Sequence, residues 1–251
     1  MVILSANAED GCTAHVKFYD IIILVGGRGT RLQSVVSDRP KPLAEVAGRP
    51  FVEWLLLALR AQGVRRAVLA TGYKGEMVEA YFADGARLDM NLTYAHETVP
   101  LGTGGAARHA LEQTSTERVL VLNGDSFCPF DVARLLEAHA RTAAVATLWL
   151  VHMDDCGRYG AVDVADDGRV RSFQEKSPNL GAGLINAGVY LFERSALEAI
   201  PTGRAVSLER ETFPALIGQS LYATVGEGPF LDIGTPESYA SAEQFFGPAQ
   251  K

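Results

Sequence analysis

A glycine-rich turn near the start of the chain has the composition of a phosphate-binding loop. Residues 24–32, Leu-Val-Gly-Gly-Arg-Gly-Thr-Arg-Leu, leave a short apolar run and place Gly26, Gly27 and Gly29 in close succession. Because glycine lacks a Cβ atom, backbone N–H groups in such a turn can approach a polyphosphate closely. Arg31 adds a charged donor. Alone, the turn does not establish a function, because an ordinary tight turn has the same composition.

The spacing of this turn excludes two familiar nucleotide loops. A dinucleotide fingerprint needs a third glycine where Leu32 stands, and a Walker A loop needs Gly-Lys-Ser/Thr at residues 30–32, where the chain has Thr-Arg-Leu. A different signal begins eight residues beyond Arg31, at residues 39–43, Arg-Pro-Lys-Pro-Leu. The two prolines restrict the backbone on either side of Lys41 and predict that it is not in a helix. A lysine whose backbone is held so rigidly is better explained as a cation directed at a ligand than as a solvated surface residue.

The elements that must position these residues alternate between short apolar strands and amphipathic helices in the first half of the chain. A strand–helix–strand repeat of this kind is typical of a parallel sheet with helices on both faces. The predicted fold class is therefore α/β. Strands are expected at residues 21–25, 67–71, 92–96, 119–123 and 144–151, and helices at residues 51–62, 76–82, 104–113 and 132–141.

The pattern changes after about residue 154. Strands at 161–164 and 170–174 would flank the hairpin signature Asp166-Asp167-Gly168. A further strand is predicted at 187–192, a helix at 208–217, and a closing helix at 236–246 that Thr235 would cap. We expect residues 1–20 to be an N-terminal extension and residues 21–251 to be one domain. Its first half would span about 21–150, and its second half, about 151–246, would supply one wall of a cleft.

Composition narrows the class of protein. The chain has 251 residues, of which 47% are hydrophobic and 21% charged, as in a globular protein. Its net charge of −7 argues against a nucleic-acid partner, which would favour a basic face. No run approaches the roughly 18 apolar residues of a membrane span, and the N-terminal segment lacks the features of a secretory signal. We therefore expect no membrane partner. The cysteines Cys12, Cys128 and Cys156 form no CxxC pair, which favours a reduced, cytoplasmic protein.

The glycine-rich turn followed by Pro-Lys-Pro resembles the sugar-phosphate nucleotidyltransferase family, whose signature is Gly-Gly-x-Gly-Thr-Arg-Leu and then Pro-Lys-Pro. The resemblance extends over residues 21–246 and implies a Rossmann-like, mixed and mainly parallel sheet with a small sugar-binding lobe. Asp232 on its own would more simply belong to the turn that opens the closing helix. Other matching segments are Leu101–Ala106, similar to the family's base-binding loop; Asn123-Gly124-Asp125, at the end of a strand; Tyr159-Gly160-Ala161, Glu175-Lys176 and Asn186–Tyr190, similar to its sugar-phosphate wall; and Asp232–Pro236, similar to the segment with its second metal carboxylate.

The resemblance implies transfer of a nucleotidyl group from a nucleoside triphosphate to a sugar 1-phosphate, with release of pyrophosphate. Two anions meet in that reaction and charge builds on the leaving pyrophosphate, so catalysis depends on positioning and charge neutralisation. Mg²⁺, which prefers oxygen ligands, would be bound by Asp125 and Asp232. Arg31 would neutralise the pyrophosphate, Lys41 the α-phosphate and Lys176 the incoming sugar phosphate.

Three groups of site residues follow from the resemblance. The expected catalytic residues are Arg31, Lys41 and Asp125, and the expected metal ligands are Asp125 and Asp232. The expected nucleotide-binding residues are Leu24, Gly26, Gly27, Gly29, Thr30, Arg31, Glu97, Gly102 and Thr103. The expected sugar-phosphate-binding residues are Asn123, Gly160, Glu175, Lys176, Asn186 and Gly188, with Glu175 accepting hydrogen bonds from sugar hydroxyls.

The base preference depends on Glu97, which lies five residues before Gly102, where the family places a residue that reads the base. Guanine presents two adjacent donors that a carboxylate can accept, whereas uracil and thymine present one donor between two acceptors, which an amide suits better. Glu97 therefore favours GTP. The alternative is that Glu97 only caps the loop and faces solvent.

The identity of the sugar is less well marked. Residues 33–38, Gln-Ser-Val-Val-Ser-Asp, together with the Leu-Gly-Thr-Gly-Gly-Ala and Asn-Gly-Asp segments, are most similar to the D-glycero-α-D-manno-heptose 1-phosphate guanylyltransferases, bacterial enzymes of capsule or surface-glycan synthesis. Mannose 1-phosphate guanylyltransferase is the alternative. A non-catalytic regulator that binds an NDP-sugar would be expected to lose charged residues that this chain retains. The sequence leaves a homodimer open.

Overall fold

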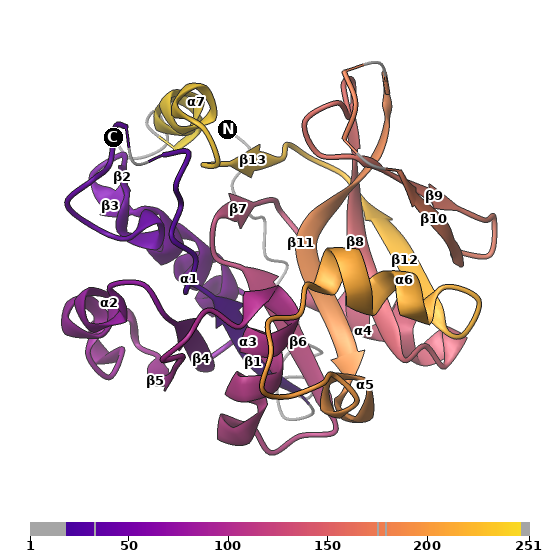
Figure 1. Ribbon diagram of the computed structural model, residues 1–251, viewed down its shortest axis with the longest axis horizontal. Helices are drawn as coiled ribbons and strands as arrows, with labels where there is room; N and C mark the ends of the chain where they lie inside the picture. The colour runs from indigo at the N-terminus through magenta and orange to yellow at the C-terminus, as the bar shows by residue number, and fades with distance from the viewer. Residues whose placement is uncertain (1–18, 33, 175, 179, 247–251) are drawn as a thin grey trace.

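A seven-stranded sheet forms the centre of the molecule (Figure 1). The computed structural model describes residues 19–246, except for residues 33, 175 and 179. Every neighbouring pair of strands is parallel except the two pairs made by β11, which runs antiparallel to β6 and β8. This mixed, mainly parallel sheet confirms the predicted fold class. In spatial order the strands are β12 (Leu221–Gly226), β8 (Ala146–Met153), β11 (Gly183–Glu193), β6 (Arg118–Asn123), β1 (Tyr19–Leu24), β4 (Arg66–Thr71) and β5 (Asn91–His96).

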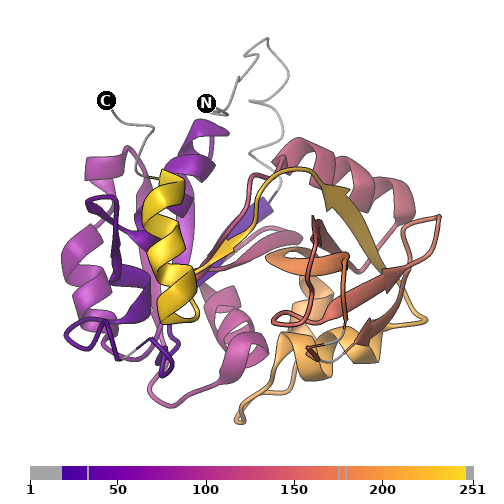
Figure 2. The same ribbon diagram turned by 90° about the horizontal axis from the view of Figure 1, so that it is seen from above.

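Hydrophobic side chains project from both faces of the sheet. On β1, Ile21 and Ile23 belong to one core and Ile22 to the other, as the two-residue period of a strand requires. Figure 2 shows helices on both sides of the sheet, as predicted. The first core includes residues of α1 (Phe51–Ala61), α2 (Gly75–Phe82) and α4 (Val132–Thr142); the second includes residues of α3 (Gly102–Ala110), α5 (Arg194–Glu198) and α6 (Phe213–Leu216).

The second half of the chain adds a hairpin and a closing helix. Strands β9 (Ala161–Val164) and β10 (Val170–Gln174) pair antiparallel across the predicted turn, in which Gly168 has a φ of +86°. The closing helix α7 (Pro236–Phe246) begins after Thr235, whose hydroxyl accepts a hydrogen bond from the Ser238 N–H at 3.3 Å. Both the hairpin turn and the helix cap were predicted from the sequence. Two short ladders complete the fold: β7 (Ser126–Phe127) with β13 (Leu231–Asp232), and β2 (Glu45–Val46) with β3 (Arg49–Pro50).

Some elements differ from the prediction. Strand β12 has no predicted counterpart, because it lies at the edge of the sheet and only its two end residues are buried. Residues 208–217 form a π-helical turn, η5 (Leu208–Thr212), and then the short α6. Pro214 explains the break, since it has no N–H to continue an α-helical ladder, and the Thr212 N–H bonds the Ser207 carbonyl at 3.1 Å. Helix α3 begins two residues before the predicted start, and short 3₁₀ turns occur at Ala86–Leu88 (η3) and Leu111–Gln113 (η4).

A third hydrophobic cluster fixes α7 against the first helix. The ring of Phe246 stacks on Trp54 with 4.6 Å between centroids and meets Phe51 and Phe127 edge-on. Because Phe127 belongs to β7, the C-terminal helix is packed directly against the ladder that β13 forms with β7. Aromatic contacts of this kind add roughly 0.5–1.5 kcal/mol each beyond the burial of their area.

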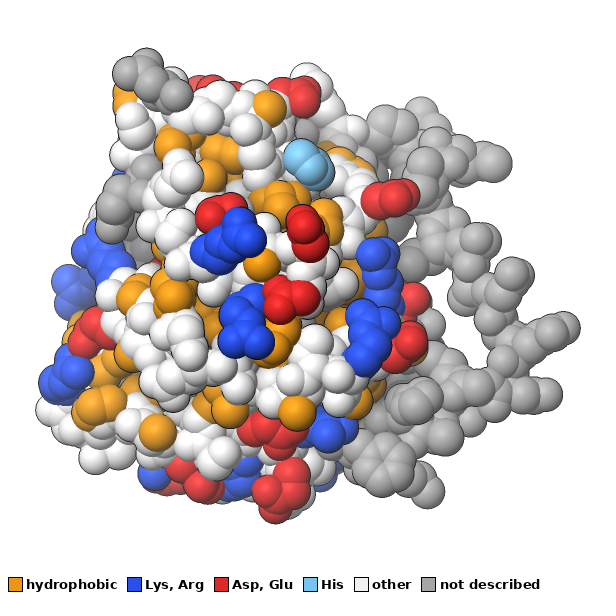
Figure 3. All heavy atoms as spheres, turned by 90° about the vertical axis from the view of Figure 1, so that its right-hand side faces the viewer, with side chains coloured by type: hydrophobic (Ala, Val, Ile, Leu, Met, Phe, Trp, Pro, Cys, Tyr) orange, Lys and Arg blue, Asp and Glu red, His pale blue; other side chains and the backbone are white. Residues whose placement is uncertain are grey.

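The surface of the molecule carries charges of both signs. On the face shown in Figure 3, acidic and basic side chains are interspersed with apolar and uncharged ones. This face therefore lacks, among its described residues, the continuous basic stripe that a nucleic-acid partner would favour. Within the part of the chain that the structure describes, no helix is both long and apolar enough to cross a membrane.

A buried carboxylate anchors α1 to its surroundings. The side chain of Glu53 is only 1% exposed, yet it accepts hydrogen bonds from Arg49 at 2.7 Å, from Arg87 at 2.8 Å and from the Tyr81 hydroxyl at 3.1 Å. Burial alone would raise the pKa of Glu53, but the two arginines outweigh it and the pKa is lowered below 4.5. The ionised carboxylate is therefore stabilised in the folded state.

We expect Glu53→Gln to lower the free energy of unfolding at pH 7 by about 2 kcal/mol, because hydrogen bonds to a charged group are lost. The lowered pKa makes this stabilisation complete above the unfolded-state pKa of 4.5 and removes it as pH falls through the folded-state value. Urea unfolding at pH 7 and at acidic pH should therefore show the two proteins converging in acid. Glu137→Gln, at an exposed position of α4, serves as the control. An equal difference at both pH values would contradict the assignment.

Candidate active site

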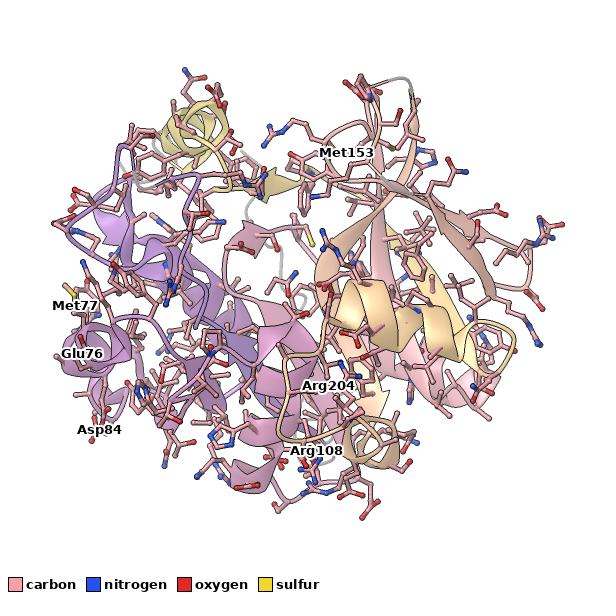
Figure 4. The ribbon with its side chains drawn as sticks, in the orientation of Figure 1. Glu76, Met77, Asp84, Arg108, Met153 and Arg204 are labelled. Atoms are coloured by element: carbon pink, nitrogen blue, oxygen red, sulfur yellow. The ribbon has the colours of Figure 1, made fainter. Side chains whose placement is uncertain are left out.

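A cavity of about 590 Å³ opens at the carboxyl ends of four adjacent parallel strands, β6, β1, β4 and β5. Ligands of open α/β sheets bind at this edge. Figure 4 shows the side chains in the orientation of Figure 1. The wall of the cavity contains nine of the residues predicted for the site, namely Leu24, Gly26, Gly27, Lys41, Glu97, Gly102, Thr103, Asn123 and Asp125. It also contains others, such as Gly72, Tyr73, His96 and Glu209.

The glycine-rich turn fits closely around the predicted lysine. Gly29 has a φ of +57°, and a Cβ atom on it would lie 2.8 Å from the Cβ of Lys41, so both conformation and space require glycine there. Thr30 and Arg31 continue the turn and are exposed. A Cβ atom placed on Gly234 would lie 3.7 Å from Nη2 of Arg31. Arg31 thus reaches toward the segment that follows β13, outside the lining of the cavity.

Lys41 opens a single 3₁₀ turn, η2 (Lys41–Leu43), contrary to the prediction that the flanking prolines exclude it from a helix. The turn is compatible with Pro42, because a proline in the first turn removes only an N–H that would have no helical partner. The Lys41 side chain is 11% exposed, and its Nζ lies 2.6 Å from Oδ2 of Asp125, whose side chain is 47% exposed. A nearly buried cation is thereby paired with a carboxylate that faces the cavity.

The two predicted metal carboxylates come from neighbouring chain segments. The Asp125 carbonyl accepts a hydrogen bond from the Ile233 N–H at 3.0 Å, directly beside the ladder of β7 and β13. Oδ1 of Asp232 accepts hydrogen bonds from the Tyr159 hydroxyl at 2.9 Å and from Arg158 at 3.3 Å. Burial and the neighbouring Asp232 raise the pKa of Tyr159 to about 12. Tyr159 therefore remains a hydrogen-bond donor that orients Asp232.

The donor set suits a hard divalent cation that also binds a substrate. Asp125 and Asp232 offer carboxylate oxygens, the ligands that Mg²⁺ prefers. Among the described residues, no group of three or more His, Cys, Asp or Glu side chains is arranged to hold a metal ion. A metal between Asp125 and Asp232 would therefore need phosphate or water oxygens to complete its coordination. Mg²⁺ in phosphate-transfer sites is usually bound in this way.

The segment predicted to read the base closes one side of the cavity. Oε2 of Glu97 accepts a hydrogen bond from the Leu101 N–H at 3.1 Å, and burial raises the pKa of Glu97. Gly102 has a φ of +69°, and a Cβ atom there would lie 2.5 Å from the Val206 carbonyl oxygen. The hydroxyl of Thr103 donates to Glu209 at 2.8 Å. It also accepts from the Leu208 N–H at 2.8 Å, so this side chain mainly joins α3 to η5.

Two residues predicted for the sugar phosphate bond to one buried hydroxyl, and a third bonds to one of those two. Asn186 and Asn123 donate their amide N–H groups to the hydroxyl of Tyr190 at 2.9 Å and 3.3 Å. Gly188 donates its N–H to Asn186 at 2.9 Å, and a Cβ atom on it would lie 2.6 Å from Oγ of Ser126. Oδ1 of Asn123 is buried without a hydrogen-bond partner among the described residues. The structure therefore brings Asn123, Asn186 and Gly188 together.

The remaining predicted residues lie apart from the cavity lining. Gly160 has a φ of +79° and a Cβ atom on it would meet the Gln174 carbonyl at 2.5 Å, which places it at the end of β10. Lys176 is exposed, and its backbone nitrogen lies 3.7 Å from that same Cβ position. Glu175 lies outside the described residues. Gly160 and Lys176 are thus near each other on the second half of the chain.

A family model described as nucleotidyl transferase matches residues 20–247. The chain belongs to the nucleotidyl transferase family. The match covers all the described strands and helices except Tyr19, the first residue of β1. The family resemblance inferred from the glycine-rich turn and the Pro-Lys-Pro segment is confirmed.

Similar nucleotidyl transferases include two named guanylyltransferases. The chain is 40% identical to the mannose-1-phosphate guanylyltransferase of Mycobacterium tuberculosis, over 88% of this chain and 62% of that protein. It is 37% identical to the D-glycero-alpha-D-manno-heptose 1-phosphate guanylyltransferase of Aneurinibacillus thermoaerophilus, over 90% of this chain and 97% of that protein. The chain therefore spans less than two thirds of the mycobacterial relative. The crystal structure of HddC from Yersinia pseudotuberculosis, complexed with GMP-PN, is similar with a TM-score of 0.81 and 33% identity, over 91% of this chain and all of that one.

Several cavity residues of this nucleotidyl transferase were not identified from the sequence. Gly72 and Tyr73 directly follow β4, and the Tyr73 N–H donates to the Gly26 carbonyl at 3.1 Å. Their position at a strand end is a signal that could have indicated them. Glu209 gives no such signal, because it reaches the cavity only through the contact between η5 and α3.

Proposed function

We propose that this nucleotidyl transferase moves a GMP group from GTP to a sugar 1-phosphate, giving a GDP-sugar and pyrophosphate. The observation that carries the proposal is the pairing of Lys41 with Asp125 at 2.6 Å, where both residues line a cavity that the glycine-rich turn also lines. A cation and a carboxylate so placed can act on a triphosphate and on the metal that accompanies it. The names of the two similar guanylyltransferases support guanine as the base.

The chemistry requires no nucleophilic side chain. An oxygen of the sugar phosphate forms a bond to the α-phosphorus, while the bond from that phosphorus to the bridging oxygen breaks and its electron pair leaves with pyrophosphate. The attacking phosphate oxygen is already deprotonated, so no general base is needed. The enzyme's task is to align two anions and to neutralise the charge that develops.

Residues in the lining of the cavity and beside it would divide this task. Backbone N–H groups of the turn at Gly26 and Gly27 would hold the phosphates, and Lys41 would exchange the carboxylate of Asp125 for the α-phosphate. Arg31 would balance the charge of the leaving pyrophosphate. A divalent metal held by Asp125 and Asp232 would supply further charge neutralisation to the phosphates.

Glu97 would recognise the base. Its Oε2 already accepts one bond from Leu101, but a carboxylate oxygen has a second lone pair, and Oε1 remains available for the adjacent guanine donor. A Cβ atom placed on Gly26 would lie 2.8 Å from this Oε1, so the carboxylate sits against the glycine-rich turn on the nucleotide side. This position favours the base-reading role over a solvent-facing cap.

D-glycero-α-D-manno-heptose 1-phosphate is the first candidate for the acceptor, and mannose 1-phosphate is the second. The heptose enzyme and the HddC structure support the first, and the mycobacterial enzyme supports the second. The acceptor phosphate would be bound near Lys176, with Asn123, Asn186 and Gly188 around the sugar. A cytoplasmic location, a homodimer, and the division into halves near residue 150 stay predictions from the sequence.

A matrix of five nucleoside triphosphates against heptose, mannose and glucose 1-phosphates, measured by pyrophosphate release, tests the function. We expect GTP with heptose 1-phosphate to give the largest kcat/KM. A larger kcat/KM with mannose 1-phosphate would make mannose 1-phosphate the first candidate for the acceptor. No pyrophosphate release with any pair would reject the transfer reaction.

The metal carboxylates can be tested by changes that preserve shape. We expect Asp125→Asn and Asp232→Asn each to lower turnover by about 10² or more, because a charged ligand for the metal is lost. Asp163→Asn, at an exposed position of β9, is the matched control and should retain full activity. Turnover would be measured over a range of Mg²⁺ concentrations. Wild-type turnover in Asp232→Asn would remove Asp232 from the site.

Lys41→Met should lower kcat more than it raises KM for GTP. A cation on the α-phosphate contributes most as charge shifts in the transition state, so its loss affects the chemical step more than ground-state binding. Steady-state kinetics with varied GTP and saturating sugar phosphate separate the two constants. A change confined to KM would make Lys41 an ordinary binding residue.

Glu97→Gln should lower kcat/KM for GTP by at least about tenfold. The amide N–H₂ group would then face a guanine donor, and a charge-assisted hydrogen bond of roughly 1.5–3 kcal/mol would be lost. The loss for UTP should be much smaller, because uracil offers an acceptor to the new donor. The ratio of kcat/KM for GTP to that for UTP is the measurement, with Glu76→Gln at an exposed position of α2 as the control. An unchanged ratio would mean that backbone groups, and not Glu97, recognise the base.

A further inference from the structure

A second cavity, of about 320 Å³, lies on the other side of the segment that closes the nucleotide cavity. It is large enough for a phosphorylated sugar or a metabolite of similar size. Its lining comes from three parts of the chain: residues 96–99 and Leu101, which begin at the last residue of β5; Gly105, Arg108, His109 and Glu112 on α3 and η4; and residues 201–204 after α5.

The two cavities share one wall. His96, Glu97, Thr98 and Val99 line both of them. The hydrogen bond from the Leu101 N–H to Glu97 closes this segment into a compact loop between the cavities. A ligand in the second cavity would therefore contact the back of the loop whose front faces the nucleotide.

Arg108 is the most informative residue of this second cavity. Its Nε atom is buried and has no hydrogen-bond partner among the described residues. Buried polar groups are normally satisfied, and a guanidinium offers only donors. The unpaired N–H therefore calls for an acceptor that the described part of the chain does not provide.

The other charges around the cavity are compatible with an anion. Arg204 lines it from the segment after α5, and Figure 4 shows Arg108 and Arg204 on the same side of the molecule. Arg204 is bound to Glu211 at 2.7 Å but is 54% exposed, so part of its guanidinium stays accessible. Of the two glutamates in the lining, Glu112 is exposed, and Glu97 turns its Oε1 toward Gly26 and Gly72 on the nucleotide side.

We propose that the second cavity is a regulatory site for a small phosphate monoester, whose phosphate is bound by Arg108 and Arg204. Arginine is well suited to phosphate because its planar donors match two phosphate oxygens. The carbon part of the ligand would lie against the apolar side chains of Val99, Leu101 and Pro201, which line the cavity. Binding would change the affinity for the nucleotide through the shared loop. By linkage, the nucleotide would change the affinity for the phosphate ligand by the same factor.

Direct binding provides the first test, and it does not require the transfer reaction to take place. The nucleotide cavity of the full chain is filled with a non-hydrolysable GTP analogue and Mg²⁺, and glucose 6-phosphate or orthophosphate is titrated by calorimetry up to about 10 mM, the weak end of specific binding. We expect glucose 6-phosphate to bind and Arg108→Leu to weaken it at least about tenfold, the loss of one charged hydrogen-bonding group. Tighter binding of glucose 6-phosphate than of orthophosphate supports a phosphate monoester as the ligand, and equal or weaker binding would contradict it.

Three further variants distinguish binding in this cavity from binding at the acceptor site and from a general effect of surface charge. Arg204→Leu should weaken binding as Arg108→Leu does. Because Arg204 is exposed, this substitution should not prevent folding. Lys176→Met should leave the binding unchanged, because it alters the proposed acceptor site instead. Arg171→Leu, at an exposed position of β10, controls for general loss of positive charge. Binding that survives both Arg108→Leu and Arg204→Leu, or no binding of either probe to the native chain, overturns the proposal.

Kinetics provide the second test, which rests on the proposed function. In the native enzyme, glucose 6-phosphate should change KM for GTP by at least about threefold, within the usual range of coupling between sites. It should leave KM for the sugar 1-phosphate unchanged. Arg108→Leu should keep basal kcat and abolish the response. Absence of basal pyrophosphate release would reject the transfer reaction alone, whereas a native-like response in Arg108→Leu would reject the regulatory site alone.

Discussion

The antiparallel pairing of β7 with β13 is the contact on which the arrangement of the site depends. Each strand has only two residues, yet together with the bond from the Ile233 N–H to the Asp125 carbonyl they join segments about a hundred residues apart. So short a ladder cannot persist alone, since isolated two-stranded pairs are marginal in water. The aromatic contacts of Phe127 with Phe245 and Phe246 supply the missing stability by packing α7 against it. The C-terminal helix therefore determines where the second carboxylate lies.

The ion pair between Lys41 and Asp125 has a related consequence. A lysine that is nearly buried loses much of its hydration, and that loss must be offset by a nearby negative charge. Asp125 provides this charge when no substrate is present, and a triphosphate brings negative charge of its own. The lysine can thus change partners without its charge ever being left unpaired. The close fit of Gly29 against the Lys41 side chain restricts the movement of its aliphatic part during that exchange.

Much of the fold and part of the site could be predicted because they depend on local sequence. The glycine-rich turn, the end of β6 and the closing helix follow from strand ends, glycine and capping signals that act over a few residues. Asp232 could not be decided locally, and the structure explains why. Its Oδ2 accepts a bond from the Gly234 N–H at 3.0 Å, as in a helix-opening turn, while its Oδ1 is directed by Tyr159. One side chain makes both the local contact and the distant one, and only the second bears on the site.

What the sequence could not reveal depends on contacts between distant segments. Glu209 enters the first cavity because the Thr103 hydroxyl bridges α3 to η5, and no pattern near residue 209 indicates that bridge. The same bridge, together with the bonds from the Gly104 and Gly105 N–H groups to the Val206 carbonyl, places the segment after α5 beside α3. That packing also creates the second cavity. The packing that shapes the first cavity therefore also encloses the second, and one set of contacts positions both sides of the loop at residues 97–101.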